Sequence, residues 1–270
     1  MKRKFLVQGT AVLAAFAASC GICCWFFSGL NIFEFGLVDR LTAVSTDEGR
    51  TVIVIDPGHG GMDGGASSPE GVQEKDINLS IAKELACAAR DCGAEVIMTR
   101  NSDAGLYTDD GRTIRQKKRE DLLARKKIIE ESGADIAVSI HLNSFPQDAS
   151  VYGAQVFYPK SSKTRTDVQE GEQSSRSFAE SVQKSLEINI EDGRTREAMG
   201  KNDILLFENT EAKIILVECG FLSNQKECRL LQTPEYQRKL SKAIWEGINE
   251  ILCLEKPKKI QVIDSTNKEG

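Results

Sequence analysis

Two histidines occur among the 270 residues of this chain, and each follows a run that reads as a buried strand. His59 follows the apolar segment 51–56 and a Pro-Gly pair, and His141 directly follows the segment 135–140. Imidazole is the commonest metal ligand among side chains. Open α/β sheets place their functional groups at the carboxyl ends of their strands. The two histidines therefore indicate a metal site that is assembled from distant parts of the chain.

Two carboxylates can complete this site. Glu74 lies at the start of a predicted helix, after the Gly-rich loop that follows the first strand, and Glu218 directly follows the segment 213–217. A catalytic zinc ion takes three protein ligands, of which two histidines and one glutamate are a known set, and keeps one position for water. His59, Glu74 and His141 can form that set. Glu218 is then left as a carboxylate near the open position.

Other interpretations of the same residues stay open. Glu70 competes with Glu74 as the carboxylate ligand, although its place between a proline and a glycine is typical of a solvated charge at a loop tip. Glu74 itself can be a first-turn acid that the helix dipole stabilises. Each histidine alone can be a hydrogen-bonding loop residue. The small residues that flank both histidines favour the metal site, because they let backbone and substrate approach closely.

Glu218 also has a purely structural interpretation. A charge at the end of a buried strand needs a partner or a function, and the basic residues that could form a salt bridge with it are Arg196, Lys201 and Arg229. Neither histidine belongs to an HExxH motif, which excludes a zinc site carried on one helix.

Strands and helices alternate along the chain around these residues. The segment 51–56 is apolar on both faces, as in a parallel strand that helices cover on both sides. We therefore predict an α/β fold, with a mostly parallel twisted sheet and helices on both faces, as a single catalytic domain over residues 51–253. The expected strands are 51–56, 95–99, 135–140, 153–158 and 213–217, and the expected helices are 76–92, with Asp76 as its cap, 119–132, 172–190, 224–231 and 234–253.

The N-terminal residues differ from the rest of the chain. Three basic residues precede an uncharged stretch over 5–33, which is long enough to cross a bilayer. The basic residues before this stretch favour export of the rest of the chain. Residues 1–34 are therefore predicted to be a signal-anchor or a cleaved signal peptide, with a lipoprotein cleavage site before Cys20 as a third possibility. Residues 35–50 read as a linker, and 254–270 as a polar disordered tail.

Composition limits the partners and the redox chemistry. The net charge of −5 gives no argument for binding nucleic acid. Of the eight cysteines, three lie in the N-terminal apolar stretch, and five lie in the body without a CxxC pair: Cys87, Cys92, Cys219, Cys228 and Cys253. An odd number without that spacing predicts free thiols and no disulfide framework.

Five segments in order resemble the zinc-dependent N-acetylmuramoyl-L-alanine amidases of cell-wall hydrolysis. They are Ile55–Gly61, Glu74–Leu79, Met98–Arg100, Ser139–Asn143 and Val217–Asn224, and the resemblance covers about residues 51–253. Within this family the chain is most similar to the sporulation type, which has a short N-terminal apolar segment and a single catalytic domain.

The resemblance implies a role for each matching residue. His59, Glu74 and His141 match the ligands of Zn²⁺, and Glu218 matches the catalytic glutamate. Arg125 matches an arginine that we expect to be structural. Hypotheses concern three further residues. Cys219 departs from the family pattern and is expected to be a buried, inert thiol. Asn143 is a candidate for contacting substrate, and either Asp56 or Asn143 could orient an imidazole.

The implied reaction is hydrolysis of the amide that joins N-acetylmuramic acid to L-alanine in peptidoglycan, in the setting of spore cortex maturation. The implied partners are peptidoglycan, an accessory lipoprotein or second cortex enzyme, and a membrane through the N-terminal segment. The implied location is outside the cytoplasm, either anchored or secreted, and between the two forespore membranes for a cortex enzyme. A zinc peptidase that cuts within the stem peptide, and a catalytically silent wall-binding protein, are the alternatives.

Overall fold

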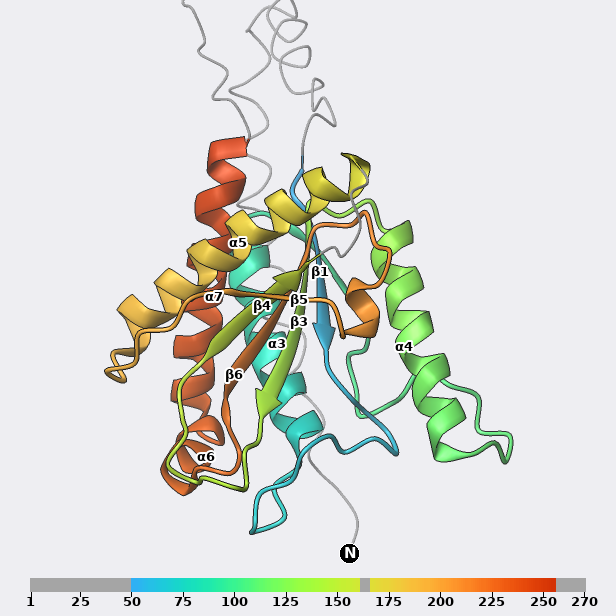
Figure 1. Cartoon of the computed structure of the whole chain (residues 1–270), viewed down its shortest axis with the longest axis vertical. Coiled ribbons are helices and arrows are strands. Elements are labelled where there is room, and N and C mark those ends of the chain that lie inside the picture. Colours follow the sequence, from blue (N-terminus) through green and yellow to red (C-terminus); the bar gives the residue numbers. More distant parts are fainter. Residues whose placement is uncertain (1–49, 161–165, 256–270) are drawn as a thin grey trace, which may run out of the picture. The chain divides into compact units, whose positions relative to one another are not determined.

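The computed structural model of the chain describes residues 50–160 and 166–255 (Figure 1). The predictions for residues 1–34, for the linker 35–50 except Arg50, and for most of the tail concern residues outside these ranges. Within them, no helix is both long and apolar enough to cross a membrane.

Six strands form one sheet in the order β2-β1-β3-β6-β4-β5. Neighbouring strands run parallel except for β4, which is antiparallel to β6. The predicted α/β fold with a mostly parallel sheet is thus confirmed. The strands are β1 (Val52–Pro57), β2 (Glu95–Met98), β3 (Ile136–Asn143), β4 (Gln155–Pro159), β5 (Met199–Lys201) and β6 (Ile214–Phe221).

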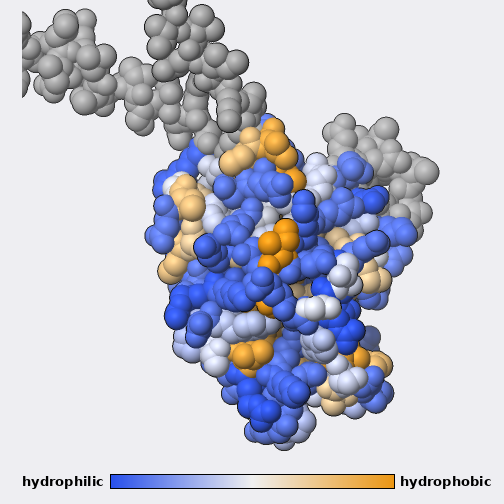
Figure 2. Space-filling model, turned by 90° about the vertical axis from the view of Figure 1, so that its left-hand side faces the viewer, coloured by the Kyte–Doolittle hydropathy of each residue, from blue (hydrophilic) through white to orange (hydrophobic). Residues whose placement is uncertain are grey.

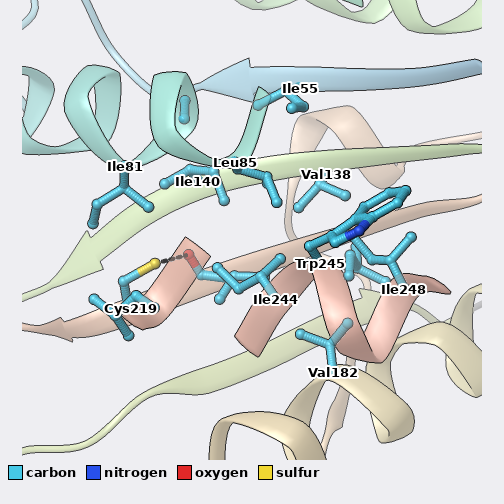
Figure 3. Packing of buried hydrophobic residues seen from close by; sticks show 14 of the residues in the cluster. Ile55, Ile81, Leu85, Val138, Ile140, Val182, Cys219, Ile244, Trp245 and Ile248 are labelled. Atoms are coloured by element: carbon cyan, nitrogen blue, oxygen red, sulfur yellow. Dashed lines mark hydrogen bonds between the residues drawn. The ribbon is translucent and has the colours of Figure 1, made fainter. Parts of the chain in front are cut away.

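Helices cover both faces of this sheet (Figure 1). The larger core packs three of them, α3 (Glu74–Asp91), α5 (Thr166–Ile190) and α7 (Pro234–Glu255), against one face. Figure 3 shows Ile55 and Val138 of the strands facing Leu85 of α3 and Ile244 of α7. The short α6 (Gln225–Leu231) joins β6 to α7.

The opposite face holds a smaller core. Val54 of β1 belongs to it, whereas its neighbours Ile53 and Ile55 belong to the larger core, as the two-residue period of a strand requires. Ile129 of α4 (Ile114–Glu131) and Phe207 of the 3₁₀ turn η1 (Leu205–Phe207) cover it. A strand buried on both faces explains the uninterrupted apolar run of the sequence.

Some element boundaries differ from those expected. Helix α4 begins at Ile114 rather than 119, because Thr113 and Gln116 form a reciprocal capping box there. Helix α3 begins at Glu74, so Asp76 lies in its first turn and is not its cap. Helix α5 begins at Thr166, six residues before the expected start. Strand β5 and η1 have three residues each and were not predicted.

On the face that α5 and α7 cover, hydrophobic residues appear as separate small areas among hydrophilic ones (Figure 2). The described part of that face therefore carries no extended apolar patch of the kind that marks a large protein interface.

Candidate active site

His59, Glu74 and His141 come together at the carboxyl end of the sheet. His59 lies two residues beyond β1, His141 lies in β3, and Glu74 opens α3. The Glu74 Oε2 lies 3.2 Å from His59 Nε2, and its Oε1 lies 3.0 Å from His141 Nδ1. The three residues offer ligand atoms that all lie within 4.8 Å of one another. The structure thus assembles the set that the sequence predicted.

The Glu74 side chain is buried, and hydrogen bonds hold it in place. The backbone N–H groups of Ala66 and Leu142 donate to its two oxygens at 2.8 and 3.0 Å, and the Asn78 amide donates to Oε1 at 3.1 Å. Burial by itself raises the pKa of Glu74, but the hydrogen bonds with His141 and His59 outweigh it and hold that pKa well below its usual range. Glu74 is therefore a fixed carboxylate.

Asp63 orients the first histidine. Its Oδ2 lies 2.8 Å from His59 Nδ1, and its Oδ1 lies 2.7 Å from the ammonium of Lys118. Burial lowers the pKa of His59, but hydrogen bonds with Asp63 and Glu74 outweigh it and raise that pKa to about 9. Such a carboxylate fixes the tautomer and orientation of a metal-ligating imidazole.

Asp63 was not predicted from the sequence, and the two residues proposed to orient an imidazole form other hydrogen bonds. Asp56 instead accepts hydrogen bonds from Thr99, Ser139 and Arg125. The Oδ1 of Asn143 accepts one from the next backbone N–H. The available signal was the position of Asp63, four residues after His59 in the same loop.

Glu218 faces the same cluster from β6. It is paired in register with His141 on the adjacent strand, and its buried Oε2 has no hydrogen-bond partner among the described residues. Burial is the main cause that raises the pKa of Glu218 to about 7. Within the described ranges no ion pair joins Glu218 to Arg196, Lys201 or Arg229, so the salt-bridge alternative is not found.

Two buried arginines hold the loop that carries His59. Arg125 of α4 donates to Asp56 and to the carbonyl oxygens of Pro57 and His59, and Arg100 donates to the Pro57 carbonyl as well. His59 has a left-handed backbone, with φ of 63°, which costs of order 1–3 kcal/mol and persists only where the surroundings impose it. These contacts give Arg125 the structural role that we expected from the sequence.

Two positions of this loop require glycine because side chains of the candidate ligands lie very close to them. A Cβ at Gly58 would lie 2.3 Å from the His141 ring, and one at Gly65 would lie 2.5 Å from Glu74 Oε2. Gly65 also has a φ of +68°, which favours glycine. The small flanks seen in the sequence thus make room for the candidate ligands themselves.

The remaining residues named from the sequence lie outside the cluster or are inert. Glu70 is exposed and hydrogen-bonds Ser68, so it does not compete with Glu74. Cys219 is fully buried next to Glu218, with its Sγ 3.8 Å from the Val217 carbonyl oxygen (Figure 3). Burial raises its pKa far above the usual range, which keeps the thiol protonated. The five cysteines in the described ranges are free.

The model of one protein family, described as N-acetylmuramoyl-L-alanine amidase, matches residues 53–250. The chain belongs to this family. The enzyme is accordingly an N-acetylmuramoyl-L-alanine amidase that acts on peptidoglycan. The match contains all the residues of the cluster and Glu218.

Relatives of this amidase agree with the family. A germination-specific N-acetylmuramoyl-L-alanine amidase of Bacillus subtilis is 38% identical over 216 residues, which are 80% of this chain and 86% of that protein. The CwlD amidase of Clostridioides difficile, solved in complex with the GerS lipoprotein, is 40% identical with a TM-score of 0.70, and covers 76% of this chain and 100% of its own. AmiC2 of Nostoc punctiforme is 29% identical with a TM-score of 0.60, over 76% and 98% of the two chains.

Proposed function

We propose that this amidase is zinc-dependent and hydrolyses the amide between N-acetylmuramic acid and L-alanine in spore cortex peptidoglycan. His59, Glu74 and His141 would hold the metal, and Glu218 would be the catalytic base. The proposal rests on the convergence of the three ligand atoms beside Glu218, whose buried Oε2 has no hydrogen-bond partner among the described residues.

The donor set fits zinc. Two imidazole nitrogens and one carboxylate are a recognised catalytic combination that leaves a position open. Asp63 behind His59, and Asn78 behind Glu74, supply the outer hydrogen bonds that such ligands need. The carboxylates of Glu74 and Asp63 contact the two ring nitrogens of His59. Their negative charge favours a cation at this site.

Glu218 would carry out the proton transfer in this reaction. Bound zinc would supply Lewis acidity, which polarises the scissile carbonyl and acidifies water. The carboxylate of Glu218 would accept a proton from the attacking water and pass it to the amine of L-alanine as the amide bond breaks, which leaves the lactyl group as a carboxylate. A positioned acid–base group of this kind contributes roughly 10²–10⁴ in rate.

The sporulation setting is supported by the named relatives. The relative in Bacillus subtilis is called germination-specific. The CwlD amidase was solved with a lipoprotein, and we propose that an accessory lipoprotein also binds this chain, beside or in place of a second cortex enzyme. We further propose that the enzyme acts outside the cytoplasm, tethered or exported through residues 1–34, and between the forespore membranes during cortex formation. Asn143 remains the proposed substrate contact.

The mass of the product tests this function. Spore cortex and vegetative wall are digested in parallel with the full chain, and the fragments are analysed by mass spectrometry. We expect intact stem peptides with a free L-alanine amine, and glycan with a free lactyl carboxyl group, with faster release from cortex. A cut within the stem peptide would identify a peptidase, and no release from either wall would identify a silent binding protein.

A further inference from the structure

A cavity of about 680 Å³ lies beside α6, and none of the four residues assigned to the catalytic site lines it. Its size falls within the range of small-ligand sites. We call it the α6 pocket. The lining that matters here is Tyr152, Leu230 and Tyr236 as apolar groups, with Asp192, Lys226 and Glu227 as charged groups.

Hydrogen bonds already hold the walls of the α6 pocket in place. The side-chain amide of Asn224 donates to the Ala149 carbonyl at 2.9 Å, which ties α6 to the loop after β3. The buried Glu227 accepts the Gly153 N–H at 2.9 Å and the Phe221 N–H at 2.7 Å. Both oxygens of Glu227 are therefore engaged in hydrogen bonds within the pocket wall, and the pocket is formed before a ligand binds.

The α6 pocket lies at the same end of the sheet as the catalytic cluster. One wall, 149–152, belongs to the connection that follows the His141 strand β3, and the other belongs to α6, which follows the Glu218 strand β6. Figure 1 shows α6 at the end toward which β1 and β3 point. A long substrate that crosses the catalytic cluster can therefore reach this pocket.

We propose that the α6 pocket binds an N-acetylhexosamine unit of the glycan strand, next to the muramic acid whose amide is cut. The rings of Tyr152 and Tyr236 and the side chain of Leu230 would contact the apolar face of the sugar. The Arg194 guanidinium lies 4.2 Å from the centre of the Tyr152 ring and holds that ring in place. Within the described ranges the Tyr236 hydroxyl makes no hydrogen bond, so it can donate one to a sugar hydroxyl.

The charges at the pocket have no excess of one sign. Asp192 and Lys226 line it with opposite charges, the Arg194 guanidinium lies over Tyr152, and both oxygens of Glu227 are taken up by backbone N–H groups. A neutral N-acetylhexosamine suits such a lining. The inference rests on the peptidoglycan amidase activity, and it does not depend on which metal the catalytic site holds.

Binding of tetra-N-acetylchitotetraose to the full chain tests the proposal by calorimetry, because this probe has neither lactyl group nor peptide. We expect the wild type to bind it. Tyr152→Ala and Leu230→Arg should each weaken binding about fivefold to tenfold, as loss of one aromatic or apolar contact does. Leu230 is 49% exposed, so its substitution preserves the fold even if Tyr152→Ala does not. The matched control is Ile188→Ala, which removes an apolar side chain that is 61% exposed on α5, outside the pocket.

Three results would overturn the assignment. They are no binding by the wild type, equal binding by wild type and both pocket variants, and binding of a sugar-free stem peptide that the same variants abolish. Failure here is distinguishable from failure of the amidase function. If the wild type releases intact stem peptides but does not bind the tetrasaccharide, the pocket assignment is wrong and the proposed function stands.

Discussion

Glu218 is half-buried beside both histidines, and its buried Oε2 has no hydrogen-bond partner among the described residues. We predict that Glu218→Gln keeps about one zinc per chain but lowers kcat by roughly 10²–10⁴, because the amide retains the shape and cannot accept the proton. Metal analysis and product release on the same sample measure both quantities. Turnover equal to that of the wild type would remove Glu218 from the base role.

The pH profile gives the same variant a second readout. Burial raises the folded-state pKa of Glu218 to about 7, and a base is active only when it is deprotonated. The kcat/KM of the wild type should therefore rise with pH up to about 7, and a bound cation moves this rise to lower pH by favouring the carboxylate. The residual activity of Glu218→Gln should lack that rise.

Asp63 supports His59 from outside the ligand set. Asp63→Asn should weaken zinc affinity by about 10- to 100-fold, as loss of such an outer carboxylate does, when measured by competition with a chelator. Asp103→Asn is the matched control. Asp103 hydrogen-bonds Gly61 of the same loop and ion-pairs with Lys75 without contacting a histidine. Equal loss of affinity in both variants would assign the effect to the loop as a whole.

The candidate ligands could be predicted from sequence, whereas their supporting residues could not. His59, His141 and Glu74 stand at strand and helix ends, which the apolar pattern locates. Asp63 acts through the left-handed turn at His59, whose φ is 63°, and no local pattern reports where a carboxylate points after such a turn.

Among the elements, α4 and β1 are joined by a buried ion pair. Arg125 and Asp56 are each 1% exposed and lie 2.7 Å apart. We predict that Arg125→Met destabilises the fold by about 3–5 kcal/mol, since it leaves the Asp56 carboxylate buried without its cation. Urea unfolding measures the loss.

The exposed pair on the same helix is the control for Arg125. Lys127 lies 3.8 Å from Glu131, and both side chains are largely exposed, so Lys127→Met should cost at most about 1 kcal/mol. If Arg125→Met costs no more than Lys127→Met, α4 does not hold the His59 loop in the way described.

The helices and strands differ in how well the sequence pattern predicts them. The central strands β1, β3 and β6 were predicted because their apolar runs are buried on both faces. Strand β5 has three residues, pairs only with β4 at the sheet edge, and leaves Met199 half exposed, so it has no apolar run to detect. The start of α4 was missed although its signal, Thr113 with Gln116 three residues later, stands in the sequence.

For the whole molecule, the described residues contain both hydrophobic cores and the complete catalytic cluster. We predict that deleting residues 1–34 leaves a folded domain with its zinc content and its turnover of isolated peptidoglycan within about twofold of the full chain, since burial drives folding. Metal analysis and product release check this, with Glu218→Gln in the shortened chain as the inactive control. Loss of zinc or of folding would show that the segment does more than tether the enzyme.

The fold class and the chemistry of the chain were accessible from sequence because both depend on patterns within short segments. The α6 pocket was not, since its walls come from the connection after β3, the loop at Asp192 and two helices. No single segment carries a sequence pattern that predicts a pocket formed by residues from several distant segments.

Anomalous diffraction at the zinc edge, from crystals of active, zinc-loaded enzyme, would locate the metal that we assign to His59, Glu74 and His141. We expect a single strong peak about 2.0–2.2 Å from one nitrogen of each histidine and from a Glu74 oxygen. A peak on other residues, or none in crystals of protein that turns over peptidoglycan, would contradict it.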